Sequence, residues 1–286
     1  MAATVDRFGF LGRPAPDEWQ RGRRHDRRAD MIEGVLLDLG GVVYVGDQPL
    51  PGALEALERL RATGLPLRYI TNTTRTPKRG MMDKLRRLGV PAGEAELFMP
   101  ALAARRYLEQ RGLSPQLLVH PALREDFAGL PGDGPEAVVI GDAAEGFTYQ
   151  ALNGAFRALV GGAEFLALAR NRSFQDADGA LSLDAGPFVA ALEYASGREA
   201  TLFGKPSRAF FEAALDALGC AADQAVMVGD DVESDVAGAM AAGLMGVLLR
   251  CGKSRPGDEA LVEPPPSAVL TDLTEAVGWI LAHARR

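Results

Sequence analysis

A short apolar segment that ends in an aspartate constrains the fold more than any other stretch. Val35 to Leu37 form an uninterrupted apolar run, and Asp38 and then Gly40 and Gly41 follow it. Such a run predicts a buried central strand, and the glycines predict that the strand ends there. In an open α/β sheet, the chemistry lies beyond the carboxyl ends of the strands. Asp38 is therefore either a nucleophile that forms an aspartyl-phosphate or a polar residue of the turn chemistry that ends many strands.

The same alternation of strand and helix signals continues along the chain. Strands are expected at 65–70, 96–99, 117–120, 137–141, 164–168, 200–203, 225–228 and 246–249. Helices are expected from Pro51 to about Gly64, at 81–88, 100–111, 149–160, 187–195 and 208–218, and up to about 242, with a strand and a helix within 268–282. A strand, a helix and a strand in this spacing form a right-handed βαβ unit, so Thr71 should lie near Asp38. The pattern predicts an α/β protein with a parallel sheet.

The segment from 113 to 199 has its own rhythm of strands and helices. It is too long and too structured for a loop, so an inserted small domain is the simplest account. We expect a main domain made of 31–112 and 200–286, and an inserted domain at 113–199. Residues 1–30 are rich in arginine and show no sustained apolar period. They predict a disordered extension, with a nucleic-acid-binding arm as the alternative.

Charge and cysteine content limit the classes of partner. The net charge of −7 argues against a general nucleic-acid or anionic-membrane binder, because nothing offsets repulsion from the phosphates. No run of about 18 apolar residues predicts a membrane span, and the first thirty residues lack the apolar core of a signal peptide. Cys220 and Cys251 have no metal-binding or redox spacing, which suits a reducing cytosol. We therefore expect a cytoplasmic protein without a nucleic-acid or membrane partner.

Three further strand ends carry the groups that phosphoryl transfer needs, namely a nucleophile, a divalent cation and donors around the phosphate oxygens. Asp38 is a candidate nucleophile and Mg²⁺ ligand, and Asp230 is a candidate second carboxylate on Mg²⁺. Thr71 offers a hydroxyl and Asn72 an amide. Lys205 is the cation that can bridge the phosphate and Asp38, since two carboxylates and a phosphate would otherwise repel one another.

Each of these features also has a structural interpretation. The Gly-Lys-Pro-Ser stretch at 204–207 is compatible with a simple turn before a helix that Ser207 caps. Thr71 and Asn72 are compatible with a helix cap. Asp231 and Asp235 are compatible with charges that favour the N-terminus of a helix. The functional interpretation depends on the conjunction, because four separate strand ends present complementary chemistry.

Four short motifs resemble those of the haloacid dehalogenase superfamily: Asp38 with Gly41-Val42, Thr71-Asn72, Gly204-Lys205-Pro206 and Gly229-Asp230-Asp231. The insertion resembles the C2 type of cap in that superfamily, and the likeness extends from about residue 31 to the end. Four other stretches are most similar to a C2-capped branch that hydrolyses pyrophosphate and phosphoramidates: 34–38, 147–150, 191–195 and 224–227. The resemblance implies a Rossmann-like core with a parallel sheet and an inserted α/β cap.

The resemblance also implies roles for single residues in an Mg²⁺-dependent phosphatase that acts through an aspartyl-phosphate on a small phosphorylated substrate. The implied nucleophile is Asp38, and the implied Mg²⁺ ligands are Asp38, Asp230 and the backbone carbonyl of Gly40. The implied phosphate-binding residues are Thr71, Asn72 and Lys205, with the Gly40–Gly41 loop beside them. Asp231 and Asp235 are implied not to bind the metal directly but to form hydrogen bonds with metal-bound waters or with Lys205.

Gly40 departs from the superfamily pattern. Most phosphatases of the superfamily that this chain resembles have a second aspartate there, which protonates the leaving group and then activates water. The pyrophosphate branch, which the chain resembles most, typically has serine. General acid–base help is worth about 10²–10⁴-fold. A leaving group that needs little protonation, such as the phosphate of pyrophosphate or an already protonated phosphoramidate nitrogen, loses least. We therefore expect pyrophosphate or phosphoramidate substrates.

Three alternatives remain. The first is a catalytically weak phosphate-binding protein that keeps the fold and dimerises through its cap, for which Gly40 is the best argument. The second is a small-molecule phosphate monoesterase. The third is a dehalogenase, which needs no metal, so Lys205 with Asp230 and Asp231 beside it argues against that activity. An enzyme of the expected type also leaves room for a homodimer through the cap.

The cap is expected to set substrate size by closing over the strand ends. Two stretches are candidates for contact with the substrate, 142–147 and 170–174. Within them, Asp142, Asn171 and Arg172 are the specificity candidates. Arg170 and Arg172 are equally compatible with a solvated surface.

Overall fold

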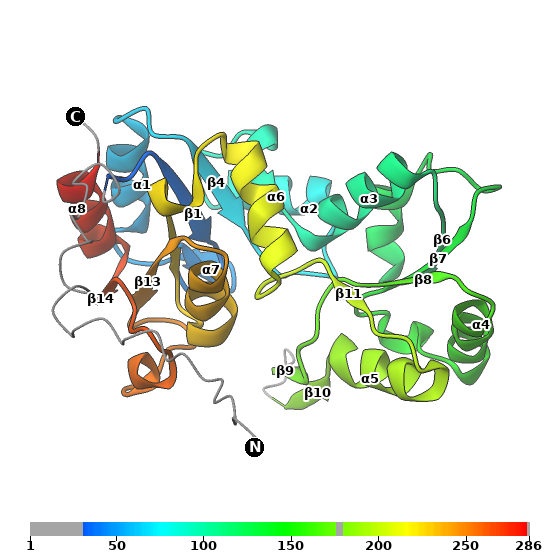
Figure 1. Ribbon diagram of the computed structural model, residues 1–286. Helices are drawn as coiled ribbons and strands as arrows, with labels where there is room; N and C mark the ends of the chain where they lie inside the picture. The colour runs from blue at the N-terminus through cyan, green and yellow to red at the C-terminus, as the bar shows by residue number, and fades with distance from the viewer. Residues whose placement is uncertain (1–30, 176–179, 285–286) are drawn as a thin grey trace, which may run out of the picture.

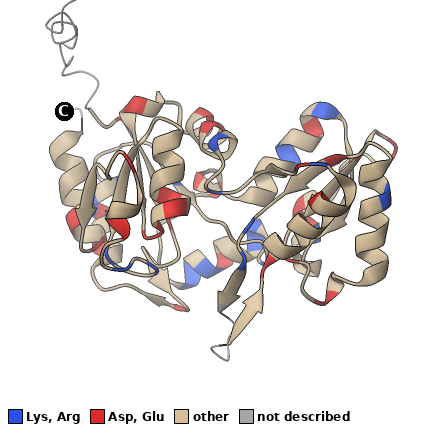
Figure 2. Ribbon diagram, turned by 60° about the horizontal axis from the view of Figure 1, so that its bottom comes forward, with Lys and Arg blue, Asp and Glu red and all other residues tan. Residues whose placement is uncertain are grey.

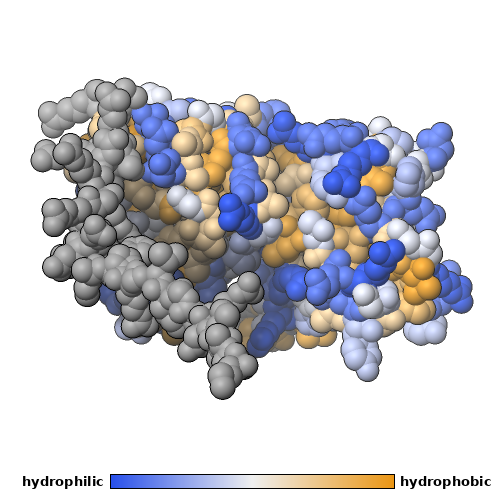
Figure 3. All heavy atoms as spheres, viewed as in Figure 1, coloured by the Kyte–Doolittle hydropathy of each residue, from blue (hydrophilic) through white to orange (hydrophobic). Residues whose placement is uncertain are grey.

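The computed structural model describes residues 31–175 and 180–284, which form two lobes joined side by side (Figure 1). The expectation of a disordered extension at 1–30 lies outside the described residues. The larger lobe contains both described ends of the chain, and the smaller lobe is built from the middle of the sequence. The surface is hollowed between the two lobes (Figure 3).

A six-stranded parallel sheet in the order β14-β13-β12-β1-β4-β5 forms the centre of the larger lobe. Strand β1 (Gly34–Asp38) lies between β12 (Ala225–Gly229) and β4 (Leu67–Ile70) and is buried along its whole length. The outer strands are β13 (Met245–Leu249), β14 (Ala268–Leu270) and β5 (Leu97–Phe98). Because all neighbours run parallel, the carboxyl ends of β1, β4 and β12 meet at one edge, as the sequence predicted.

Helices cover both faces of this sheet because alternate residues of a buried strand point to opposite sides. Val35 and Leu37 belong to an apolar cluster with the helices on one face, and Leu36 belongs to a second cluster on the other face. On the first face lie α1 (Ala53–Arg61), α2 (Lys78–Arg87) and α8 (Leu273–His283). On the second lie α3 (Pro100–Arg111), α6 (Arg208–Leu218) and α7 (Gly238–Ala241).

The smaller lobe is built on a four-stranded parallel sheet in the order β11-β8-β7-β6. Its strands are β6 (Ser114–Leu118), β7 (Glu136–Ile140), β8 (Glu164–Ala167) and β11 (Thr201–Leu202). One face packs on α4 (Tyr149–Val160) and α5 (Ala185–Ser196). On the other face, Val139 and Leu166 share an apolar cluster with Leu108 of α3 and Phe210 of α6. The two lobes are therefore joined by a continuous apolar contact.

Short elements complete the fold. Two antiparallel hairpins were not predicted: β2 (Tyr44–Val45) with β3 (Gln48–Pro49), and β9 (Ser173–Gln175) with β10 (Leu181–Leu183). The 3₁₀ turns are η2 (Glu94–Glu96), η3 (Pro121–Phe127), η4 (Ala144–Gly146), η5 (Ala222–Gln224) and η7 (Asp258–Leu261). The hairpin strands have only two or three residues each, too few for a period-2 pattern to stand out.

Three local features differ from the sequence expectation. The strand expected at 200–203 as the resumption of the main sheet is β11, which pairs with β8 in the smaller sheet. The helix expected after Gly229 begins as a π-helix, η6 (Val232–Ala237), in which the N–H of Val236 donates to Asp231 O, five residues earlier. Ser207 stands at the N-cap position of α6, but its side chain accepts no capping hydrogen bond.

Candidate active site

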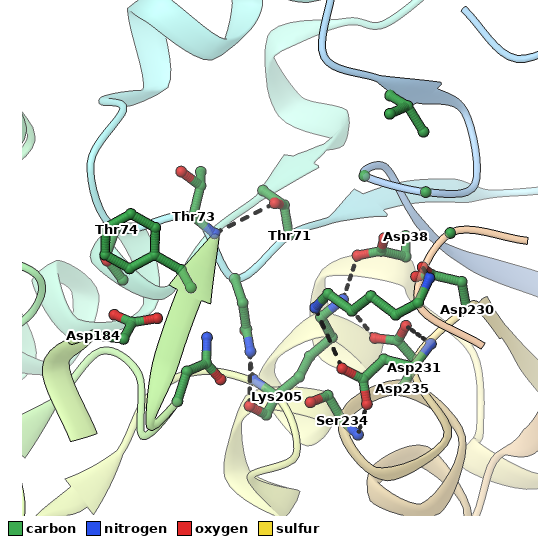
Figure 4. Close-up of a pocket in the computed structure, with 18 of the residues that line it drawn as sticks. Asp38, Thr71, Thr73, Thr74, Asp184, Lys205, Asp230, Asp231, Ser234 and Asp235 are labelled. Atoms are coloured by element: carbon green, nitrogen blue, oxygen red, sulfur yellow. Dashed lines mark hydrogen bonds and ion pairs between the residues drawn. The ribbon is translucent and has the colours of Figure 1, made fainter. Parts of the chain in front are cut away.

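A cavity of about 560 Å³ opens at the carboxyl edge of the main sheet and is lined by residues from both lobes (Figure 4). Asp38 is the last residue of β1, Thr71 follows β4, and Asp230 follows β12. All three side chains are buried and line this cavity. The proximity of Thr71 and Asp38 that the βαβ argument predicted is thus present in the structure.

Three carboxylates gather at the base of the cavity. Asp38, Asp230 and Asp235 each offer one oxygen, and these oxygens all lie within 4.8 Å of one another. Burial raises the pKa of Asp230 to about 6, although the backbone N–H of Lys253 donates to its Oδ2 at 2.6 Å. Burial likewise raises the pKa of Asp235 to about 6 and shifts the pKa of Asp38 upward. A buried set of oxygen donors with excess negative charge fits a hard divalent cation such as Mg²⁺.

Lys205 supplies the positive charge inside this cluster. Its ammonium forms ion pairs with Asp38 and, at 2.6 Å, with Asp235 Oδ1. Burial alone would lower the pKa of Lys205, but Asp235 and Asp38 together raise it, so the side chain stays charged. Lys205 follows β11, so it reaches the carboxylates from the smaller lobe's sheet and not from a strand end of the main sheet.

Two glycines allow backbone to pass close to the Asp230 carboxylate. Gly41 has φ +87° and Gly252 has φ +55°, both in the left-handed region that favours glycine. A Cβ added to Gly41 would lie 2.3 Å from Asp230 Oδ2, and one added to Gly252 would lie 1.9 Å from the same atom. Gly40 is different, because a Cβ there would meet no heavy atom of residues 31–175 and 180–284 within 4 Å. The space beside Gly40, where the sequence analysis placed the departure from the superfamily pattern, is therefore open to the cavity.

Asn72 holds the loop that carries Lys205. Its Oδ1 accepts the backbone N–H of Lys205 at 2.8 Å, and its Nδ2 donates to the backbone carbonyl of Lys205 at 2.8 Å. Thr71 Oγ1 accepts the N–H of Thr73 at 3.4 Å, and its hydroxyl remains able to donate into the cavity. The structure thus gives Asn72 a positioning contact, and direct contact of Thr71 and Asn72 with phosphate remains a prediction.

Asp231 and Lys253 form a second charged pair beside the carboxylates. Asp231 Oδ1 accepts the N–H of Ser234 at 2.9 Å, and its Oδ2 lies 3.3 Å from Lys253 Nζ. Burial would raise the pKa of Asp231, but the hydrogen bond from Ser234 and the charge of Lys253 hold that pKa below its ordinary value. The sequence analysis missed Lys253. A signal was present, since Gly252-Lys253 follows a strand, as Gly204-Lys205 does.

The cap side of the cavity agrees only in part with the sequence candidates. Asp142 and Asn171 line the cavity, whereas the structure does not bring Arg172 to it. Arg170 also lies elsewhere and forms an ion pair with Glu193. The sequence analysis missed Arg75 and Asp184. Together with Phe174, which lies in the candidate stretch 170–174, they line the cavity. They come from three separate segments, so only the folded chain shows that they face one another.

The sequence matches two patterns of one superfamily. Residues 35–129 match the family described as haloacid dehalogenase-like hydrolase, and residues 202–276 match a HAD-hydrolase-like family. The human haloacid dehalogenase-like hydrolase domain-containing protein 2 is 43% identical over 252 residues, which cover 88% of this chain and 97% of that protein. The chain is a haloacid dehalogenase-like hydrolase.

Other members of the superfamily agree with this assignment. The human phospholysine phosphohistidine inorganic pyrophosphate phosphatase is 40% identical over 264 residues, which cover 90% of this chain and 97% of that protein. A 4-nitrophenylphosphatase from Thermotoga maritima matches with a TM-score of 0.79 and 27% identity and covers 88% of this chain and 98% of its own. As a haloacid dehalogenase-like hydrolase with such relatives, the chain is a phosphatase-type enzyme, and its α/β fold is confirmed.

The described residues contain no helix that combines the length and apolarity needed to cross a bilayer. Acidic and basic positions are interspersed over both lobes (Figure 2).

The cytoplasmic location and the homodimer through the cap remain predictions, as does the division into a main domain and a cap. Because β11 pairs with β8, we place the end of the cap after Leu202 instead of at 199.

Proposed function

We propose that this hydrolase is an Mg²⁺-dependent phosphatase that acts through an aspartyl-phosphate on pyrophosphate or phosphoramidates. The observation that carries the proposal is the position of Lys205, which contacts Asp38 and Asp235 at the base of a cavity open to a small anion. The similarity to a phosphatase whose name includes phospholysine, phosphohistidine and pyrophosphate supports the substrate class.

The carboxylate cluster fits the metal that the proposal requires. The side chains of Asp38 and Asp230 and the backbone carbonyl of Gly40 would hold Mg²⁺, while Asp235 is engaged with Lys205. When bound, the metal would neutralise charge on the transferring phosphoryl group. Asp231 would then act indirectly, by holding Lys253 and the start of η6 beside Asp230.

The chain's own residues account for the two chemical steps. An Asp38 carboxylate oxygen forms a bond to phosphorus, while the bond from phosphorus to the leaving nitrogen or oxygen breaks and its electron pair departs with the leaving group. Lys205 holds the Asp38 carboxylate in place and balances charge on the phosphoryl oxygens. Water then displaces Asp38 from phosphorus, gives up a proton to solvent, and releases inorganic phosphate.

Gly40 supports substrates whose leaving group needs no proton from the enzyme. A nitrogen that is already protonated departs as a neutral amine, and the phosphate of pyrophosphate departs as a stable anion. An alkoxide has neither advantage and would need the acid that Gly40 does not supply. The open space around Gly40 means that, in the described part of the chain, no neighbouring side chain fills the position in its place.

Steady-state turnover of pyrophosphate, imidazole phosphate and a sugar phosphate, with and without Mg²⁺, tests the proposal. We expect Mg²⁺-dependent release of phosphate from the first two, slower release from the sugar phosphate, and loss of all release in Asp38→Asn. Preference for the sugar phosphate would reject the substrate class. Mg²⁺-dependent phosphate binding without turnover of any substrate would favour the alternative of a phosphate-binding protein that has lost activity with its second carboxylate.

A further inference from the structure

The cap contributes two buried carboxylates to the wall of the cavity. Asp142 follows β7, and Asp184 precedes α5 as its N-cap residue. Both are buried, with exposed fractions of 3% and 7%, and both line the cavity. Figure 4 shows Asp184 on the opposite side of the view from Asp38 and Asp230, which line the same cavity. A phosphate substrate would therefore meet additional negative charge on the side that faces its leaving group.

Asp142 is neutralised by an ion pair with Arg75. The Arg75 Nε donates to Asp142 Oδ2, and the guanidinium carbon lies 4.2 Å from the centre of the Phe174 ring. The backbone N–H of Asp142 donates to Thr74 Oγ1 at 3.4 Å, which ties the same cap residue to the loop after β4. The charge of Arg75 is thus already committed to one cap carboxylate.

Asp184 is held by hydrogen bonds instead, although the nearby charge of Arg75 also offsets part of the rise that burial causes in the pKa of its carboxyl group. Its Oδ1 accepts the N–H of Ala185 at 2.7 Å, and the side chain of Asn171 also donates to it. Within residues 31–175 and 180–284, no lysine or arginine forms an ion pair with Asp184. The two cap carboxylates and the facing Arg75 together carry one net negative charge on this side of the cavity. The Asp184 carboxylate provides that charge.

We propose that Asp184 is a specificity-determining residue that favours a phosphoramidate with a positively charged leaving group, a protonated amine or imidazole, over pyrophosphate. The inference rests on the proposed function and narrows it to one substrate class. In an in-line displacement, the leaving group points away from Asp38, toward the cap. There a protonated nitrogen is attracted by the Asp184 carboxylate, which has no ion-pair partner among the described residues, whereas the second phosphoryl group of pyrophosphate is repelled.

The expected effect lies mainly in KM. The positive charge is present on the bound phosphoramidate and decreases as the phosphorus–nitrogen bond breaks, so Asp184 interacts more strongly with the ground state than with the transition state. If Asp184 served only as the N-cap of α5, Asp184→Asn should leave KM unchanged. Asparagine caps a helix as well as aspartate does, so Asp184→Asn removes the charge and keeps the cap.

The test compares kcat and KM of the wild type, Asp184→Asn and Asp272→Asn with imidazole phosphate, pyrophosphate and 4-nitrophenyl phosphate in Mg²⁺. Asp272 is the matched control, because it caps α8 by accepting the N–H of Glu275 at 3.0 Å and does not line the cavity. For Asp184→Asn we expect KM for imidazole phosphate to rise about tenfold, with 4-nitrophenyl phosphate unchanged and pyrophosphate unchanged or improved. Equal changes for all three substrates, or no change, would overturn the proposal.

A binding measurement separates this inference from the proposed function. Aminomethylphosphonate carries a phosphonate and an ammonium but cannot be hydrolysed, and methylphosphonate lacks the ammonium. Calorimetry in Mg²⁺ should show that the wild type binds the aminomethyl compound more tightly and that Asp184→Asn loses this preference. Loss of the preference supports the inference even if no substrate is turned over, whereas an equal preference in both proteins overturns it even if phosphatase activity is found.

Discussion

Lys205 Nζ lies 2.6 Å from Asp235 Oδ1, and the same ammonium contacts Asp38. The three residues come from different parts of the fold: Lys205 follows a strand of the smaller sheet, Asp38 ends β1, and Asp235 lies in η6. All three are buried. The ammonium is therefore a structural as well as a chemical component of the site, because it is the counter-charge for carboxylates that burial would otherwise discharge.

Lys205→Met should destabilise the Mg²⁺-free protein by about 3–5 kcal/mol at pH 8, the usual cost of removing one partner from a buried ion pair. The pKa values of Asp230 and Asp235 are raised to about 6, so their protonation favours the fold at low pH, and this contribution is lost as pH rises through about 6. The loss of stability in the variant should therefore shrink below pH 6 or on addition of Mg²⁺.

Urea unfolding at pH 5.5 and pH 8, with and without Mg²⁺, measures this effect. The two pH values lie on either side of the raised pKa of about 6. Lys78→Met is the control, because Lys78 pairs at 3.5 Å with Glu94, which is 77% exposed, and such a surface pair contributes about 0–1 kcal/mol. A Lys205→Met protein as stable as the wild type at pH 8 would contradict the role assigned to the ammonium.

Gly252→Ala should weaken Mg²⁺ binding by about 10–100-fold, the range found when groups that orient a metal ligand are changed. The new Cβ would lie 1.9 Å from Asp230 Oδ2, so the carboxylate or the loop must move. Gly46→Ala is the matched control, because Gly46 also lines the cavity and has a similar φ of +56°, but its Cβ would meet no heavy atom of the described residues within 4 Å. Isothermal titration with Mg²⁺ gives both affinities. Equal affinities in the two variants would rule out a metal at Asp230.

Local signals were sufficient to predict most elements of the fold. Helix α3 begins at Pro100, which suits a first turn, and Thr148 caps α4 by accepting the N–H of Ala151. The choice of sheet for β11 could not be predicted in this way. Only Thr201 and Leu202 pair with β8, and a two-residue strand has no pattern that tells which sheet it joins.

The residues of the site also differ in how well local sequence predicts their positions. Asp38 ends one strand of the parallel sheet, and Thr71 and Asp230 follow two neighbouring strands, so their proximity follows from the order of strands alone. Arg75 and Asp184 lie more than a hundred residues apart and line the same cavity only because the cap folds over the loop after β4. The sequence around either residue does not predict that the other lies nearby. The balance of charge on the cap side of the cavity could therefore be determined only from the structure.

Gly40→Asp should raise kcat/KM for phosphate monoesters by at least about tenfold, since general acid–base help contributes about 10²–10⁴-fold when well placed. The structure provides room for the new side chain and imposes no left-handed backbone conformation at Gly40. Gly40→Asn has nearly the same shape but cannot transfer a proton, so it should give no gain. Steady-state rates with a sugar phosphate measure the effect. A gain in neither variant would mean that the proton comes from another group, such as a cap residue.

The charge of Asp184 should make both the stability of the protein and its binding of an ammonium ligand depend on pH. Burial raises the pKa of Asp184, neighbouring Asp142 adds to the rise, and the N–H of Ala185, the side chain of Asn171 and the charge of Arg75 reduce it. A raised pKa in the folded state means that ionised Asp184 costs stability, a cost that appears as pH rises through that pKa. Asp184→Asn should therefore be as stable as the wild type at pH 7 or more stable, as thermal unfolding can show.

The preference of the wild type for a ligand with an ammonium group should decrease as pH falls. As pH falls, Asp184 takes up a proton at a pH above the ordinary aspartate value of 3.8 and loses the charge that attracts an ammonium. Protonation of the phosphonate ligand and of the Mg²⁺-binding carboxylates affects wild type and Asp184→Asn alike, so the ratio of their affinities for aminomethylphosphonate isolates Asp184. This ratio should favour the wild type at neutral pH and approach one in acid. A ratio that stays constant across the titration would mean that the Asp184 charge does not act on the ligand, because no other cap carboxylate differs between the two proteins.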